Sequence, residues 1–356
     1  MFAALACLVA QALPVAPPPA VTPEHARRAS IAAVGDVMFG RYKLNDDGER
    51  RYRPVVTGEA FGYVAPMLSS ADIAFANVET PVMTEPDSFR VHQRLTFRAD
   101  PARAKELARA GFDVVSLASN HVHNLGGGGA PQSRMHLQAA GIASAGAGID
   151  PVEAFRPAIQ RVGGLKIAFL AFTVWHNARA PVAPEGAVAH LTEADLLLKG
   201  PAAVRAARAQ LAVDFVVVSV HWGIEFEAHP TPRQIAAAHA LVDAGADLIL
   251  GHHPHVVQDF ELYHGGVIAY SLGNFVFDEG ILSRRQTVIL HATFDGSGTF
   301  RRVTNVALTP VLIGHRDHIP RPATGPDYKL WQQTLRALAP DIEILPAPES
   351  RLRASR

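Results

Sequence analysis

Residues 247–258 read DLILGHHPHVVQ, so an apolar run ends at Gly251 and is followed by His252, His253 and His255. Imidazole is the side chain best suited to metal binding and to proton transfer near neutral pH. The proline between His253 and His255 stiffens the segment, and holding two imidazoles this close together is unfavourable unless something binds them. The segment therefore predicts a binding site for a metal, or a proton-transfer site, at the end of a buried strand.

Four other apolar segments end in the same kinds of side chain. IAAVGD ends at Asp36, DIAFANVE at Asn77 and Glu79, DVVSLASNH at Asn120 and His121, and DFVVVSVHW at His221. Each residue alone has an ordinary explanation as a turn residue, a loop acid or a core histidine. Together they favour a shared site, because independent turns have no reason to use only metal-binding chemistry and never Lys or Arg.

Ligands of open α/β sheets bind beyond the carboxyl ends of the strands, so these side chains are expected to meet in one crevice. Imidazole together with carboxylate suits Mn, Zn, Fe or Ni and is too rich in nitrogen for a dedicated calcium site. Six or seven such groups exceed the four of a structural zinc site and fit two adjacent metals with a shared carboxylate. Cys7 is the only cysteine, which excludes an internal disulfide and a cysteine zinc site.

Short apolar runs alternate with Ala-rich stretches, which is typical of an α/β fold. We expect strands at 31–34, 72–76, 113–118, 166–172, 214–220, 246–250, 266–272 and 287–294. We expect helices at 100–110, 131–140, 201–212 and 232–244, with a short one near 326–338. From about 266 to 313 the strands follow one another without a good helix between them, which predicts antiparallel structure there.

The ends of the chain differ from its body. Residues 1–13 are apolar and signal-peptide-like, although they carry no Lys or Arg, and residues 14–29 form a Pro-rich linker. We expect one domain over 30–314 and a peripheral C-terminal tail over 315–356. This organisation predicts an exported protein, periplasmic or at the cell surface, held close to a membrane through its N-terminal segment.

Composition and the remaining motifs exclude several classes of function. Lys plus Arg equals Asp plus Glu at 33 each, so no bulk charge attracts nucleic acid. The glycines at 126–129 lack the ending of a phosphate-binding loop and predict a flexible loop over the site. Ser116 and Ser271 are not in a G-x-S-x-G motif, so serine hydrolase chemistry has no support. Three arginines are candidates for binding an anionic substrate: Arg41, Arg94 and Arg98.

Seven segments, in this order, resemble the motifs of the CapA family of poly-γ-glutamate capsule synthesis proteins, a branch of the calcineurin-like metallophosphoesterase superfamily. They are GDVMFGR (35–41), FANVETPV (75–82), SLASNHVHNLG (116–126), GAGIDPVEAFRPAI (146–159), SVHWGIEF (219–226), GHHPHVVQ (251–258) and YSLGNFVFDE (270–279). The resemblance covers about residues 30–295. It implies a four-layer α/β/β/α sandwich of metallophosphoesterase type with its site at the strand ends.

The resemblance also implies a role for each residue. Asp36 would bind the first of two divalent metal ions (Mn, Zn or Fe), and Glu79 would bridge the two where the superfamily usually has an aspartate. Asn120 and His221 would bind the second metal, His253 and His255 one metal each, and His121 would be the general acid. Other residues would lie near the substrate or orient the ligands: Asn77, His123, Trp222, Glu225, His252 and Asn274.

Two positions depart from the pattern. The superfamily has a histidine where this chain has Met38, a loss that CapA-like proteins commonly share and that leaves the first metal short of a nitrogen ligand. Relatives usually have an aspartate where this chain has Asn124, which removes a negative charge near His121.

The leading hypothesis is a metal-dependent hydrolase outside the cytoplasm that acts on a phosphoester or on an anionic γ-glutamyl-type polymer, with His121 protonating the leaving group. An alternative is a non-catalytic assembly or export component of poly-γ-glutamate capsule synthesis, working with membrane-bound capsule synthesis machinery. A third hypothesis is a metal-dependent peptide epimerase that removes a proton beside a metal-polarised carbonyl.

Overall fold

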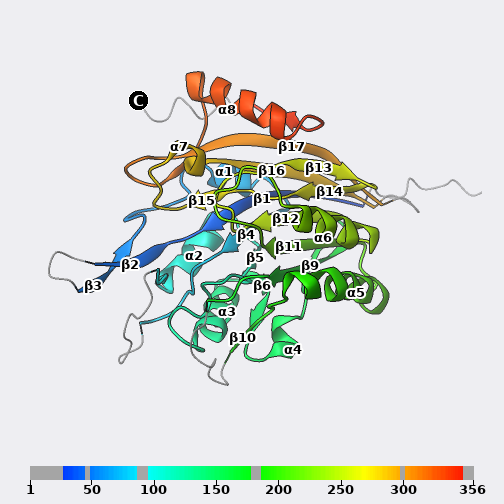
Figure 1. Cartoon of the computed structure of the whole chain (residues 1–356), viewed down its shortest axis with the longest axis horizontal. Helices are drawn as coiled ribbons and strands as arrows, with labels where there is room; N and C mark the ends of the chain where they lie inside the picture. The colour runs from blue at the N-terminus through cyan, green and yellow to red at the C-terminus, as the bar shows by residue number, and fades with distance from the viewer. Residues whose placement is uncertain (1–26, 45–48, 86–94, 178–185, 297–300, 348–356) are drawn as a thin grey trace, which may run out of the picture.

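The computed structural model describes residues 27–44, 49–85, 95–177, 186–296 and 301–347 (Figure 1). The signal-peptide-like segment 1–13, the linker up to residue 26, and Arg94 lie outside the described residues. Within the described part of the chain, no helix combines the length and the apolar character needed to cross a membrane.

The first sheet contains the parallel strands that end in one part of the predicted site. Its order is β18-β17-β16-β1-β4-β5-β6, with β15 paired to β1 and β19 to β17. Strands β1, β4, β5 and β6 run parallel, so their carboxyl ends lie at one edge. The strands are β1 (Arg28–Val37), β4 (Ile73–Val78), β5 (Val114–Ser116), β6 (Ala143–Ala145), β15 (Asn274–Val276), β16 (Gln286–Asp295), β17 (Arg302–Ile313), β18 (Pro320–Pro322) and β19 (Glu343–Ile344).

The second sheet carries the other part of the predicted site and has the order β13-β14-β12-β11-β9-β8. Its four inner strands are parallel, and the two edge strands are antiparallel to their neighbours. The strands are β8 (Ala158–Val162), β9 (Leu165–Thr173), β11 (Phe215–His221), β12 (Leu248–His252), β13 (Phe260–Tyr263) and β14 (Gly266–Ala269).

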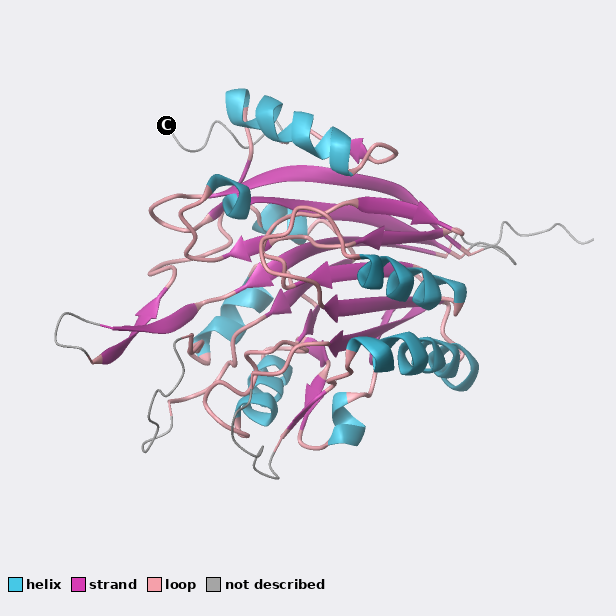
Figure 2. Cartoon of the chain, in the orientation of Figure 1, coloured by secondary structure: helices cyan, strands magenta, loops and turns pink. Residues whose placement is uncertain are grey.

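Short strands and helices complete the structure (Figure 2). Two pairs of strands stand apart from the large sheets: β2 (Gly40–Leu44) with β3 (Arg50–Pro54), and β7 (Ala147–Gly148) with β10 (Ala187–Val188). The helices are α1 (Ala65–Leu68), α2 (Ala102–Arg109), α3 (Gly129–Ala139), α4 (Pro151–Ala154), α5 (Glu193–Leu211), α6 (Pro232–Asp243), α7 (Leu282–Arg285) and α8 (Gly325–Leu338).

The two large sheets pack against each other through apolar side chains. Phe75 of β4 stacks on Phe169 of β9, with ring centroids 5.9 Å apart. On the opposite face of the first sheet, Leu107 of α2 and Leu137 of α3 enter a second apolar cluster. Helices α5 and α6 contact each other and cover the outer face of the second sheet (Figure 1). Each large apolar side chain buried in this way contributes about 1.5–3 kcal/mol to stability.

This arrangement confirms the predicted α/β class, and each expected strand and helix corresponds to one in the structure. The last part of the chain is antiparallel in the pairs β13–β14 and β16–β17, whereas β15 pairs with β1 in parallel. Helix α8 lies in the region expected to be a peripheral tail. There Trp331 is buried and its indole N–H donates to the Thr287 carbonyl at 2.8 Å.

Candidate metal centre

The register of the strands brings the predicted residues to one level. Asp36 at the end of β1 pairs with Asn77 on β4, and His221 at the end of β11 pairs with His252 on β12. The two sheets meet here, because the backbone N–H of His253 donates to Asp36 Oδ2 at 3.3 Å. Residues far apart in the sequence thus lie together, as the strand-end pattern predicted.

Asp36 is fully buried and surrounded by donors. The Asn77 amide donates to its Oδ1 at 2.8 Å, and His255 Nδ1 lies 3.3 Å from its Oδ2. Burial raises the pKa of this carboxyl, but hydrogen bonds and charge from His252 and His255 outweigh burial and hold the pKa well below its usual value. Asp36 is therefore an anion at neutral pH.

Glu79 is a polar group of the site without hydrogen-bond partners in the described part of the chain. It is fully buried, and neither carboxylate oxygen has a hydrogen-bond partner among the described residues. Three imidazole Nε2 atoms approach Oε1 without reaching hydrogen-bond distance: His121 at 3.9 Å, His221 at 3.8 Å and His255 at 3.8 Å. Burial raises the pKa of Glu79 to about 8, against the opposing charge of His255. A buried polar group without a partner costs about 1–3 kcal/mol, and more when charged, so the Glu79 carboxyl is suited to binding a cation.

A set of nitrogen and amide oxygen atoms lies beside Glu79. His221 Nε2 is 3.0 Å from Asn120 Oδ1 and 3.2 Å from His253 Nδ1. Burial and neighbouring imidazoles lower the pKa of His221 well below its usual value and that of His253 to about 3. Both rings are neutral, which leaves a lone pair on each for a metal ion.

His255 joins this set to Asp36 and Glu79. Burial lowers its pKa, but the charges of Glu79 and Asp36 outweigh burial and raise the pKa to about 10. Its Nδ1 lies 2.9 Å from Asn274 Oδ1, so Nε2 is the nitrogen that faces Glu79. Ligand atoms of Asp36, Glu79 and His255 all lie within 4.8 Å of one another, and so do those of Glu225, His253 and His255.

The backbone of the histidine segment is strained. His253 and His255 have φ values of 94° and 59°, in the left-handed region that L residues rarely adopt. Each such residue costs about 1–3 kcal/mol, and such strain is concentrated at functional sites. Close backbone contact also fixes the first strand, because a Cβ on Gly35 would meet Gly273 O at 1.9 Å.

His121 lies at the side of this cluster. Asn124 Oδ1 accepts from the Phe97 backbone N–H at 2.7 Å and lies 2.7 Å from His121 Nδ1, so Nδ1 carries the proton. The ring stacks on Phe97 with centroids 3.8 Å apart. Burial lowers the pKa of His121 to about 4, against the Asn124 hydrogen bond. Asn124, one of the two positions that depart from the family pattern, is thus the residue that fixes the tautomer of His121.

Some of the remaining predicted residues contact the proposed metal ligands, and others do not. Asn77 and Asn274 contact Asp36 and His255, and His252 Nδ1 lies 3.4 Å from Asp36 Oδ1. Trp222 does not join the site, because its indole N–H donates to the Tyr270 carbonyl at 2.9 Å within the core under α5 and α6.

His123 is partly buried, and neither ring nitrogen has a hydrogen-bond partner among the described residues. Its ring centroid is 6.0 Å from that of His176. Two of the arginines proposed to bind substrate are engaged elsewhere: Arg41 pairs with Asp278 at 2.8 Å, and Arg98 lies 4.2 Å over the Tyr52 ring.

Three side chains around the site were missed from the sequence. Trp175 has its ring 5.4 Å from that of His253, Phe226 has its ring 6.1 Å from that of His255, and Arg284 lies over Phe226. Both aromatic residues are 41% exposed. Their position next to histidine motifs was the available signal.

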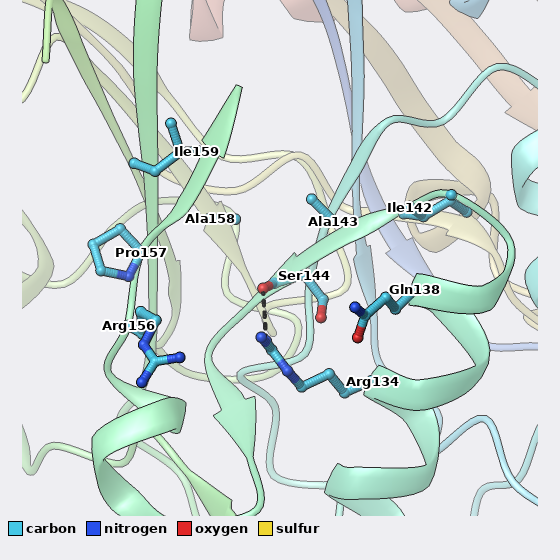
Figure 3. Close-up of a pocket in the computed structure, with 10 residues that line it drawn as sticks. Arg134, Gln138, Ile142, Ala143, Ser144, Arg156, Pro157, Ala158 and Ile159 are labelled. Carbon is cyan, nitrogen blue, oxygen red and sulfur yellow. Dashed lines mark hydrogen bonds between the residues drawn. The ribbon is translucent and has the colours of Figure 1, made fainter. Parts of the chain in front are cut away.

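A separate cavity of about 360 Å³ lies between the edges of the two sheets (Figure 3). Arg134 of α3 and Arg156 border it, and Arg134 is engaged by Glu153 at 2.9 Å and by the Ser144 carbonyl at 3.4 Å. Its lining includes none of the predicted site residues.

The fold and the site define an α/β protein with a buried carboxylate, amide and imidazole cluster suited to metal ions. A family model described as bacterial capsule synthesis protein PGA_cap matches residues 30–279. The chain belongs to this family, as its motifs predicted.

Named relatives agree with the family. The chain is 33% identical over 300 residues to the capsule biosynthesis protein CapA of Bacillus anthracis, covering 84% of this chain and 70% of that protein. It is 32% identical to the PGA biosynthesis protein CapA of Bacillus subtilis strain 168, covering 86% and 76%. It is 30% identical to a probable polyglutamine synthesis accessory protein of Mycobacterium tuberculosis, covering 60% and 58%.

Proposed function

We propose that this protein is a metal-dependent hydrolase of the CapA type that acts on an anionic γ-glutamyl-type polymer of the cell envelope, or on a phosphoester. The observation that carries the proposal is Glu79, a buried carboxylate with no partner among the described residues, beside Asp36 and His255. The relatives named for capsule and PGA biosynthesis support the choice of polymer. The packing of α2 and α3 with the first sheet and of α5 and α6 with the second supports a four-layer α/β/β/α sandwich of metallophosphoesterase type. The relatives named for capsule biosynthesis support an exported, membrane-proximal protein.

The donor set fits two divalent ions such as Mn, Zn or Fe, because it combines carboxylate and amide oxygens with neutral imidazoles. The residues that would hold them are Asp36, Glu79, Asn120, His221, His253 and His255. When bound, such ions activate water and stabilise negative charge on oxygen. Asn274 would keep His255 oriented through Nδ1, and Asn77 would do the same for Asp36.

His121 is the residue we assign to proton transfer. A pKa of about 4 makes the ring neutral at pH 7, with its proton on Nδ1 and a lone pair on Nε2. The ring can therefore first accept a proton at Nε2 from the attacking water, and it can then deliver that proton to the leaving group. This order refines the general-acid role that the family resemblance implied.

The test is a comparison of wild type with His121→Ala, purified without chelators. We expect both proteins to contain metal by elemental analysis, and we expect the variant to lose turnover of γ-glutamyl and phosphodiester substrates by about 10²–10⁴-fold. Wild-type rates equal to those of buffer with free metal would refute the hydrolase.

A second candidate function is a non-catalytic accessory component of polymer synthesis. The observation that favours it is the similarity to mycobacterial relatives named as probable polyglutamine synthesis accessory proteins. This function predicts that metal-loaded wild type and His121→Ala bind poly-γ-glutamate equally and release no products. It also predicts co-purification with membrane-bound capsule synthesis machinery.

A further inference from the structure

An aromatic and an arginine side chain stand next to the candidate metal centre and are not explained by metal binding. Phe226 has φ of 69°, and its backbone N–H donates to the Pro254 carbonyl at 2.7 Å, within the histidine segment. A bulky residue rarely adopts this conformation. The loop therefore holds the Phe226 ring beside His255, half-exposed, at the expense of backbone strain.

Arg284 lies on top of this ring. Its guanidinium carbon is 3.3 Å from the Phe226 ring centroid. The Arg284 carbonyl accepts from Asn274 Nδ2 at 3.0 Å, and Asn274 Oδ1 lies 2.9 Å from His255 Nδ1. One asparagine thus ties the Arg284 backbone to a proposed metal ligand.

The positive charge of Arg284 is only partly neutralised by a neighbouring acidic side chain. Its side chain is 24% exposed, and its ion pair with Glu279 spans 3.5 Å between Nη1 and Oε2. A guanidinium has five N–H donors in a planar fork that matches carboxylate and phosphate oxygens, and stacking on an aromatic face holds that plane in place. A fixed cation beside a site for divalent ions is unfavourable unless an anion lies between them.

We propose that Arg284 and Phe226 form an oxyanion-binding subsite, which holds a carboxylate of the substrate next to the metal centre. The inference rests on the proposed function, since it names the group that the site recognises in an anionic polymer. It implies that the free carboxylates of a γ-glutamyl chain are bound separately from the bond being cleaved. Phosphate shares this chemistry and is the other ligand of the same class.

The experiment measures equilibrium binding by calorimetry to metal-loaded protein. One ligand is tetra-γ-glutamate, and the other is the same oligomer with each free carboxylate replaced by a carboxamide. We expect Arg284→Gln to weaken binding of the acid by about 10–100-fold, as for loss of a charged hydrogen bond, and to leave the amide unchanged. Arg284→Lys keeps the charge without the fork and should fall between. Arg161→Gln, at an exposed position of β8, is the control for a change in net charge.

Equal binding of the acid by wild type and Arg284→Gln would overturn the subsite, and so would an equal loss for acid and amide. Wild type that binds neither oligomer would overturn it as well. Displacement of the acid by inorganic phosphate in wild type but not in Arg284→Gln would support a subsite for both anions. Arg284-dependent binding without any turnover would leave the subsite standing and refute only the hydrolase. Thermal unfolding of each variant confirms that it is folded.

Discussion

Replacing Asn124 by aspartate tests how His121 is tuned. Asn124 Oδ1 lies 2.7 Å from His121 Nδ1 and accepts from the Phe97 N–H at 2.7 Å, and an aspartate can keep both contacts. The substitution adds a negative charge beside the imidazole. Two unit charges about 4 Å apart interact by about 4 kcal/mol at an effective dielectric constant of ~20, which corresponds to about 3 pKa units. We therefore expect the pKa of His121 to rise from about 4 toward neutrality.

The assay is an NMR titration of imidazole signals in metal-free protein, with His121→Gln to assign the resonance. In wild type the folded pKa lies below the unfolded value of 6.5, so stability is lost as pH falls from 6.5 toward 4. Asn124→Asp should reduce that loss. Since the neutral ring accepts the proton, turnover of the metal-loaded variant should fall at mildly acidic pH. An unchanged titration would refute the electrostatic reasoning, and faster turnover at that pH would show that His121 starts as a proton donor.

Three further predictions concern metal binding and the backbone. Glu79→Gln should abolish most of the rise in melting temperature that Mn²⁺ gives wild type, with the exposed Glu59→Gln as control. Metal affinity should increase from about pH 6 to pH 8, with release of protons. The reason is that the pKa of Glu79 is about 8 and that of His255 about 10, and both groups must lose a proton to bind metal. Calorimetry in buffers of different ionisation enthalpy measures the number of protons released. Gly35→Ala should be strongly destabilised in urea, because its Cβ would meet Gly273 O at 1.9 Å, whereas Gly58→Ala meets nothing within 4 Å.

The strands of the site could be predicted because their sequences are continuous apolar runs, as expected for strands buried on both faces. The place of Trp222 could have been predicted too. Val216, Val218, Val220 and Trp222 share the face of β11 covered by helices, whereas His221 points the other way. Side chains alternate along a strand, so adjacency to His221 was evidence against a place in the site.

The surroundings of the site could not be predicted in this way. Phe226 and Arg284 lie in separate segments, and what joins them is the hydrogen bonds to Pro254 and Asn274. Such contacts depend on how two loops pass each other after the sheets have packed, and no local periodicity records them. The same holds for the backbone strain at His253, which no residue type in the segment indicates.

Several features of the candidate centre lower the stability of the metal-free chain. Glu79 is buried without a partner, His253 and His255 have strained backbones, and the pKa of His255 is high because a proton there offsets two buried carboxylates. Turn formation explains neither the unpartnered Glu79 nor the high pKa of His255, and core packing would exclude the carboxylates. The proposed divalent cation would account for both, because it would give Glu79 a partner and replace the proton of His255, and it would use the lone pairs of the neutral imidazoles. The stability lost in the metal-free chain should therefore be recovered when metal binds.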